Sequence, residues 1–183
     1  MDLISHAQAG DRAAFAALFE QYKNLVYKTA YLLLGDAHEA EDALQEVFLS
    51  VHKSLRSFDA RKGSFITWLY RITFNFCLNH RRRRHHHSSL EDVSPTPATD
   101  FPSAQLAEED SLWQATRSLS DKQQAVIVLR YYWELPYAEI ASILEVPLGT
   151  VKSRLDLALK TLRKILEEQE LGKDSISQVE VCE

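Results

Sequence analysis

The strongest candidate for chemistry in this sequence is a group of polar side chains near the start of one predicted helix. Residues 137–155 read YAEIASILEVPLGTVKSRL. They predict a short helix, a break at Pro147 and Gly149, and a second helix that Thr150 can cap. The start of the second helix carries side chains that can bond base edges or hold phosphates. They are Thr150, Lys152, Ser153, Arg154, Asp156 and Lys160. This is the layout of a helix-turn-helix that binds duplex DNA.

The apolar residues of the same stretch predict how its two helices pack. The first helix has one apolar face, at Ile140, Ala141 and Leu144. The second repeats apolar residues at the spacing of a single buried stripe, namely Val151, Leu155, Ala158, Leu159 and Leu162. Because turns with glycine also join ordinary structural helices, the pattern alone leaves a plain helical hairpin open.

A second candidate site is the acidic face of a helix that starts at Asp36. Glu39 is expected to be the capping-box partner of Asp36. The predicted buried side is Ala40, Leu44, Val47, Phe48 and Val51, and the opposite face holds Glu39, Asp42, Gln45 and Glu46. Acids near a helix start also suit an ordinary solvated face, so both that interpretation and a docking surface for a basic partner are open.

A third candidate site combines aromatic, amide and basic side chains between residues 56 and 87. Helical spacing assigns Phe65, Leu69, Ile72 and Phe76 to the core. Rings that stack on bases, amides that bond base edges and cations that hold phosphates suit single-stranded nucleic acid. The candidates are Phe58, Arg61 and Lys62 in a loop, then Trp68, Arg71, Asn75, Asn79 and Arg82 on a helix that ends in four arginines and three histidines.

The elements that must position these groups are all helices. The 183 residues include 45% hydrophobic residues and only 5 Gly and 5 Pro, with hardly any alternating β-branched runs. An amino-terminal core helix is expected between Asp11 as N-cap and Gly35. The net charge of −5 hides two opposite surfaces. Residues 53–84 hold nine Lys or Arg and one acid, whereas residues 36–46 hold five acids and no Lys or Arg.

The composition along the chain predicts two small helical domains. The expected boundaries are a first domain at 1–87, a flexible acidic linker at 88–107, a second domain at 108–168 opened by a helix from Glu108, and an acidic tail at 169–183 that frays beyond Leu166. No leader or apolar run of bilayer length is present, and Cys77 and Cys182 lie far apart. We therefore expect a cytoplasmic protein in a reducing compartment.

Three ordered motifs resemble the sigma-70 family of bacterial RNA polymerase sigma factors, extracytoplasmic-function subfamily. The run 41–48 (EDALQEVF) resembles the segment that docks on the clamp helices of the largest polymerase subunit. The run 65–72 (FITWLYRI), with Asn75, resembles the segment that reads and melts the −10 element, and residues 120–130, 137–141 and 147–154 resemble the −35 domain. The resemblance covers residues 11 to about 166.

The resemblance implies a non-enzymatic protein without cofactor or metal. It implies core RNA polymerase and promoter DNA as partners, with duplex −35 DNA bound by the second domain and melted −10 DNA by the first, and an anti-sigma factor as regulator. Residues 155–159 (LDLAL) and Gln124 depart from the family's more basic pattern. These departures predict fewer phosphate contacts and an acid near the DNA.

Two other functions compete with this interpretation. A stand-alone helix-turn-helix regulator would need a dimer interface and would bind DNA tightly without polymerase. A metal or redox module could use Cys77, His80 and residues 85–87, but the adjacent arginines would repel a cation. The acidic tail could also act as a built-in regulator in place of a separate partner.

Overall fold

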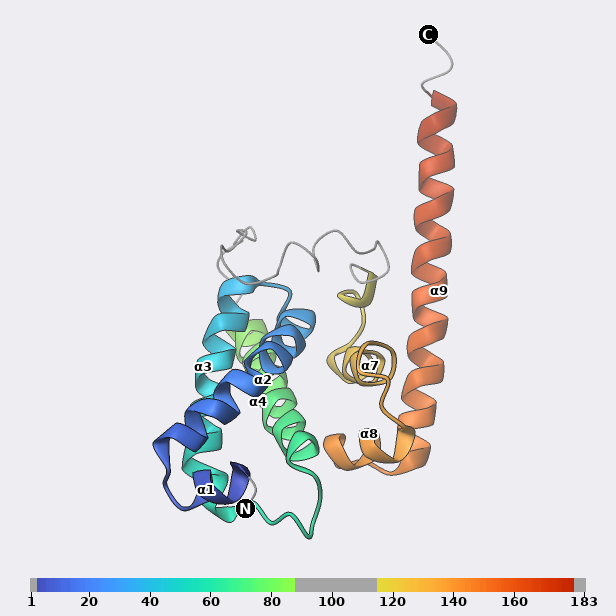
Figure 1. Cartoon of the computed structure of the whole chain (residues 1–183). Helices are drawn as coiled ribbons and strands as arrows, with labels where there is room; N and C mark the ends of the chain where they lie inside the picture. Colours follow the sequence, from blue (N-terminus) through green and yellow to red (C-terminus); the bar gives the residue numbers. More distant parts are fainter. Residues whose placement is uncertain (1–2, 88–114, 180–183) are drawn as a thin grey trace. The chain divides into compact units, whose positions relative to one another are not determined.

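The computed structural model describes residues 3–87 and 115–179, and within these ranges every regular element is helical (Figure 1). The elements are α1 (Leu3–Gln8), α2 (Arg12–Leu34), α3 (Ala37–Ser54), the short 3₁₀ turn η1 (Leu55–Ser57), α4 (Phe65–His87), α7 (Asp121–Ile127), the π-helical turn η2 (Val128–Tyr132), α8 (Tyr137–Leu144) and α9 (Leu148–Val179). The all-helical prediction is confirmed. The predicted linker, the helix expected from Glu108 and Cys182 lie outside the described residues.

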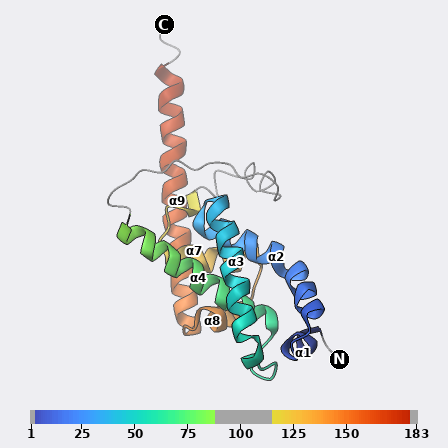
Figure 2. The same cartoon turned by 90° about the vertical axis from the view of Figure 1, so that its left-hand side faces the viewer.

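The chain forms two compact units. Unit 1 contains α1 to α4, and unit 2 contains α7, η2, α9 and α8 up to Ala141. In unit 1, α2 packs against both α3 and α4, and α3 also packs against α4 (Figure 2). These three helices bury one another's apolar faces, which removes apolar surface from water and stabilises the unit.

The ends of α2 and α3 follow from capping residues that the sequence predicts. The Asp11 carboxylate accepts hydrogen bonds from the backbone N–H groups of Ala13 (2.8 Å) and Ala14 (3.2 Å). Gly35 ends α2 with φ of 77°, a left-handed conformation that glycine adopts without strain. The Asp36 carboxylate accepts from the N–H of Glu39 at 2.9 Å and so starts α3.

The core of unit 1 agrees with the prediction on α3 and only partly on α4. The predicted buried residues of α3 are all buried: Ala40, Leu44, Val47, Phe48 and Val51. On α4, Phe65 and Leu69 are buried, but Ile72 and Phe76 are only half-buried. The stripe in the core instead runs through Leu69, Tyr70, Thr73, Phe74 and Cys77. The prediction followed one helical repeat along α4, whereas the packing of α2 and α3 on α4 selects a neighbouring stripe.

Unit 2 is built around α7 and α9, which pack against each other. Ser120 and Gln123 form a capping box at the start of α7. The predicted stripe of α9 is buried at Val151, Leu155, Ala158 and Leu162, but Leu159 is 42% exposed, so its assignment to the core was wrong. The buried side of α9 is therefore narrower than the apolar repeat of the sequence, and Leu159 lies outside it.

The turn between α8 and α9 differs from the predicted one. Glu145 takes a left-handed conformation with φ of 53° and ends α8. Helix α9 then starts at Leu148, and the carbonyl of Pro147 accepts from the N–H groups of Thr150 (2.9 Å) and Val151 (3.3 Å). Thr150 therefore lies inside the first helical turn, and its prediction as the cap was wrong because Pro147, with its fixed φ, already starts the helix.

Helix α9 also continues to Val179, past Leu166, where the sequence predicted a fraying tail. The prediction relied on the loss of the apolar stripe, and a helix needs no stripe to keep its own backbone hydrogen bonds.

Candidate nucleic-acid and protein interfaces

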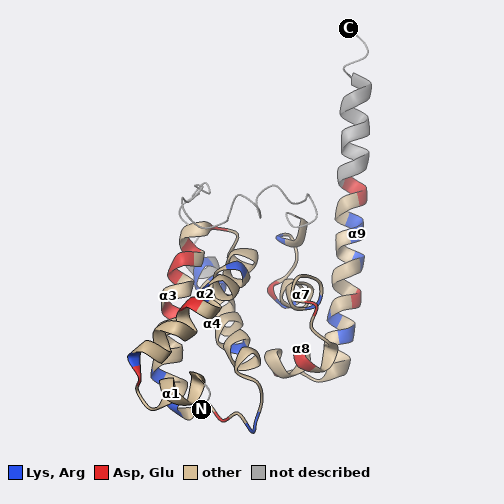
Figure 3. Ribbon diagram, viewed as in Figure 1, with Lys and Arg blue, Asp and Glu red and all other residues tan. Residues whose placement is uncertain are grey.

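One face of α3 is exposed and acidic (Figure 3). Asp42, Gln45 and Glu46 are all exposed on the side of the helix that points away from the core. Leu49, one turn further along the same side, is 51% exposed. The face thus combines polar side chains with one exposed apolar side chain, a mixture that a protein partner can cover. Sequence reasoning missed Leu49 because it lies next to the buried Val47 and Phe48.

Glu39, which the sequence placed on this face, is instead bonded to residues of α4. Both oxygens of its carboxylate accept from the Arg84 guanidinium at 3.0 Å, and His80 Nε2 lies 3.8 Å from one of them. The carboxylate therefore joins the start of α3 to the end of α4 instead of completing the predicted capping box. The predicted interface residues Asp42, Gln45 and Glu46 share a surface with Leu49, and Glu39 lies at its edge.

The arginines at the end of α4 differ in their surroundings. Arg81 donates to the carbonyl of Leu33 at 3.1 Å, which satisfies one of the unpaired carbonyls at the end of α2. Arg84 pairs with Glu39. Arg82 and Arg83 are exposed. The predicted cationic track is thus partly engaged within unit 1, and Arg82 remains a candidate for phosphate contact.

The loop before α4 is folded by its own hydrogen bonds. The Asp59 carboxylate accepts from the backbone N–H of Arg61 (3.0 Å) and, through both oxygens, from its guanidinium (3.0 and 2.9 Å). These hydrogen bonds lower the pKa of the Asp59 carboxyl and raise the pKa of Arg61. Lys62 is exposed beside them. The loop therefore presents two adjacent exposed cations on a preformed turn, and one of them, Arg61, is paired with Asp59.

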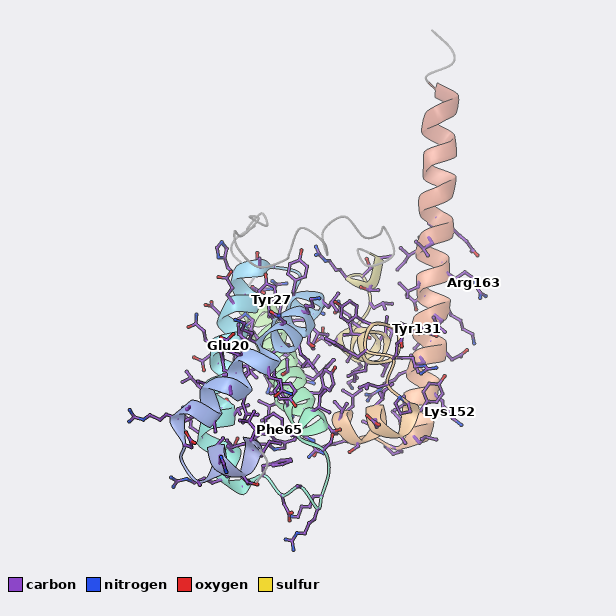
Figure 4. The ribbon with its side chains drawn as sticks, in the orientation of Figure 1. Glu20, Tyr27, Phe65, Tyr131, Lys152 and Arg163 are labelled. Carbon is purple, nitrogen blue, oxygen red and sulfur yellow. The ribbon has the colours of Figure 1, made fainter. Side chains whose placement is uncertain are left out.

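Aromatic rings connect this loop to α4. The Phe58 ring centroid lies 5.3 Å from that of Trp68 and 5.6 Å from that of Phe65, and Phe65 also contacts Tyr22 of α2 at 5.3 Å. Figure 4 labels Phe65 at the start of α4. Phe58 and Trp68 are half-buried, so each keeps part of its ring at the surface. Ring pairs at these distances stabilise the cluster by about 0.5–1.5 kcal/mol each.

The outer side of α4 continues from this cluster. Arg71 is half-buried, and Asn75 and Asn79 are exposed, at the four-residue spacing that places them along one side of the helix. The structure thus brings the predicted loop residues and the predicted helix residues onto unit 1, with Phe58 and Trp68 in contact where the two sets meet.

The start of α9 carries the predicted polar group. Lys152, Ser153, Asp156 and Lys160 are exposed, whereas Thr150 and Arg154 are half-buried. Lys152 and Arg163 extend from α9 away from α7 (Figure 4). Asp156 accepts from Lys160 Nζ at 2.9 Å, and both side chains stay largely exposed. The acid in the LDLAL run is thus partly neutralised by its neighbour.

Two further residues of unit 2, Leu157 and Gln124, bear on the predicted DNA contacts. Leu157 is 56% exposed on α9 among these polar groups, and sequence reasoning gave it no role. Gln124 is buried in α7, with 1% of its surface exposed, and the loss of a phosphate contact at this position stays a prediction.

The competing metal site gains no support from the residues described. Cys77 is completely buried, and this burial raises the pKa of its thiol to about 12. Within the described ranges, and leaving out residues 85–87, whose side chains the structure does not describe, no three His, Cys, Asp or Glu side chains are close enough together to hold a metal ion. No helix in the same ranges is long and apolar enough to cross a membrane.

Comparison with known families and proteins identifies the family of the chain. Residues 18–87 match the family described as Sigma-70 region 2, and residues 109–162 match Sigma-70, region 4. The chain is 35% identical over 179 residues to the ECF RNA polymerase sigma factor SigW of Bacillus subtilis, covering 90% of this chain and 95% of that protein. It is 30% identical over 179 residues to the RNA polymerase sigma-H factor of Pseudomonas aeruginosa, covering 90% and 92%.

Solved structures share the fold. CnrH in complex with the cytosolic domain of CnrY aligns with a TM-score of 0.68 at 22% identity, covering 91% of this chain and 96% of that one. The sigma factor RpoE in complex with the anti-sigma factor NepR from Bartonella quintana aligns with a TM-score of 0.65 at 24% identity, covering 84% and 96%. The resemblance drawn from the sequence motifs is confirmed, and the chain belongs to the ECF family of RNA polymerase sigma factors.

Proposed function

We propose that this chain binds core RNA polymerase and directs it to promoters by holding melted −10 DNA on unit 1 and duplex −35 DNA on unit 2. The observation that carries the proposal is the contact between the half-buried Phe58 and Trp68 rings, with exposed cations in the adjoining loop and exposed amides further along α4. An unpaired base can stack on a ring there while Asn75 bonds its edge and Arg61 or Lys62 holds phosphate.

The mechanism is physical rather than covalent. A surface that binds an unstacked base favours melted DNA over closed DNA by the difference in binding free energy, and so shifts the equilibrium toward the open complex. Polymerase holds the two units on one promoter, which makes the second contact intramolecular and raises its effective concentration. Neither step needs a nucleophile or a general base from this chain.

The exposed side of α9 is proposed to read the −35 element in the major groove. Lys152 and Ser153 can contact base edges or phosphates, as such helices do near their amino-terminal ends. Asp156 can accept a hydrogen bond from cytosine N4, and its pairing with Lys160 reduces the repulsion that a bare carboxylate would feel from phosphates.

Polymerase docking is proposed for the face of α3 formed by Asp42, Gln45, Glu46 and Leu49. Its acids suit a basic partner, and Leu49 gives it an exposed apolar side chain. Charge reversal of Asp42 or Glu46 to arginine should weaken polymerase binding by about 1–4 kcal/mol without disturbing the fold, because both side chains are exposed. Unchanged affinity in a competition titration would exclude this face.

Regulation by a separate anti-sigma protein is proposed from two relatives. CnrH and RpoE were solved in complexes, the latter with an anti-sigma factor. A partner of this kind would cover the polymerase-binding and DNA-binding faces until a signal releases them.

The proposed −10 function is tested with Trp68→Ala and Asn75→Ala in reconstituted transcription. Both variants should slow open-complex formation on duplex promoters more than binding to a template that is already melted at −10. A thermal melt identifies any loss of fold, since Trp68 is half-buried. Equal losses on both templates in a folded variant would refute the melting role, and tight promoter binding without polymerase would favour a stand-alone regulator.

A further inference from the structure

Helix α1 ends in a turn that fixes the direction of its last residue, Gln8. The N–H of Asp11 bonds the carbonyl of His6 (3.1 Å), the N–H of Gly10 bonds the carbonyl of Ala7 (3.0 Å), and Gly10 has φ of 95°. This is a Schellman motif, whose left-handed position glycine occupies at no steric cost. Since Asp11 then caps α2, α1 is held firmly on the first turn of that helix.

The Gln8 side chain reaches a segment about fifty residues away. Its amide nitrogen Nε2 donates to the carbonyl of Leu55 at 3.0 Å and to the carbonyl of Phe58 at 2.8 Å, both in a partly buried setting. An amide nitrogen has two hydrogens, so both bonds can form at once. Gln8 therefore bridges the two ends of η1.

The Phe58 backbone is consequently held on both sides. Its N–H donates to the carbonyl of Leu55 at 3.0 Å, and its own carbonyl accepts from Gln8. These bonds fix where the chain leaves η1 and where the Phe58 ring meets Trp68, 5.3 Å between centroids. The turn with Asp59 and Arg61 follows directly. A residue of α1 thus sets the start of the loop that leads to α4.

We propose that Gln8 is a positioning residue for the capture of the unpaired −10 base. By holding the Phe58 peptide it keeps the loop in place before DNA arrives, so that binding does not have to order the loop. The inference rests on the proposed function of the Phe58 and Trp68 surface. Gln8 itself need not touch DNA, and its effect passes through Phe58.

The test uses the full chain with core polymerase and the variants Gln8→Leu and Gln8→Glu. Leucine removes the donor, and glutamate keeps the length but places acceptor oxygens against two carbonyls. Gln21→Leu is the matched control, since Gln21 is exposed on α2. The probe is a fork template with an unpaired −10 strand in which one base at a time is varied.

Both Gln8 variants should bind the fork template about 3- to 30-fold more weakly, the range expected for losing one or two hydrogen bonds of this kind. They should also lose preference among bases at one −10 position, while −35 preference and core polymerase affinity stay unchanged. Gln21→Leu should behave as the unaltered protein.

Phe58→Ala separates failure of this inference from failure of the proposed function. If Phe58→Ala weakens binding and flattens base preference but the Gln8 variants do not, Gln8 has no positioning role and the surface keeps its function. If Phe58→Ala also has no effect, the loop does not bind −10 DNA and the proposed function of this surface fails. A uniform loss of −10 preference, −35 preference and polymerase binding by the Gln8 variants, with a lower melting temperature, would mean a purely structural role and overturn the inference.

Discussion

Replacing Leu49 by alanine should weaken the binding of core RNA polymerase more than an exposed surface change ordinarily does. Leu49 is 51% exposed on the acidic face of α3, one turn beyond Gln45 and Glu46. Full burial of a leucine side chain stabilises by about 1.5–3 kcal/mol, so covering the exposed half on docking would contribute about 0.8–1.5 kcal/mol. Its loss corresponds to a roughly 4- to 12-fold increase in Kd.

The assay is a competition titration in which each variant displaces labelled wild-type protein from core polymerase. Leu49→Met is the matched control, because methionine keeps an apolar side chain of similar size and should retain most of the affinity. Leu49→Asp should lose more than alanine does, since a carboxylate would be buried or would keep the partner away. Thermal melts should be nearly unchanged for all three, because half of the side chain already faces water.

Equal affinities of the alanine, aspartate and unaltered proteins would refute the reasoning. Leu49 would then play no part in docking, and charge alone would have to explain any effect of reversing the neighbouring acids. A large fall in melting temperature for Leu49→Ala would instead show that its buried half matters for the fold.

The remaining predictions concern the recognition helix, the carboxy-terminal segment and the buried thiol. Asp156→Ala, assayed on a randomised −35 element with polymerase present, should relax preference at one position by about 1–3 kcal/mol, and a uniform gain at all sequences would point to simple repulsion of phosphates. Deleting residues 172–183 should leave transcription with purified polymerase unchanged if a separate partner regulates the protein; raised activity would instead identify this segment as the regulator. In a Cys182→Ser variant, Cys77 should resist alkylation at pH 8 until the protein unfolds. Burial raises the pKa of its thiol from 9.0 to about 12 and so keeps the thiol protonated. Rapid labelling of the folded variant would contradict this.

Much of the local structure could be predicted from the sequence because its causes are local. Asp11, Gly35 and Asp36 mark helix ends through hydrogen bonds to residues two to four positions away, and these bonds form as expected. The same holds for the buried stripe of α3, whose spacing follows directly from the helical repeat. The order of the motifs then identified the family, which the comparisons confirm.

Errors arose where two local signals competed. Thr150 is a good capping residue, but Pro147 two residues before Gly149 already starts α9. Leu159 fits the apolar repeat, yet it lies outside the buried strip of α9. Periodicity states which residues share a side of a helix, but the neighbouring helix decides how wide the buried strip is.

The sequence by itself therefore predicted an all-helical chain with a helix-turn-helix, through its composition and helical spacing. With charge segregation, it also predicted the three groups of side chains proposed to bind polymerase and DNA. Only the tertiary structure decided which of these groups are engaged inside the protein. Glu39 pairs with Arg84, the Phe58 ring packs on Trp68, and Gln8 holds the Phe58 backbone. These partners lie ten to fifty residues apart, and their meeting depends on how whole helices cross, which the spacing of residues within any one helix does not encode.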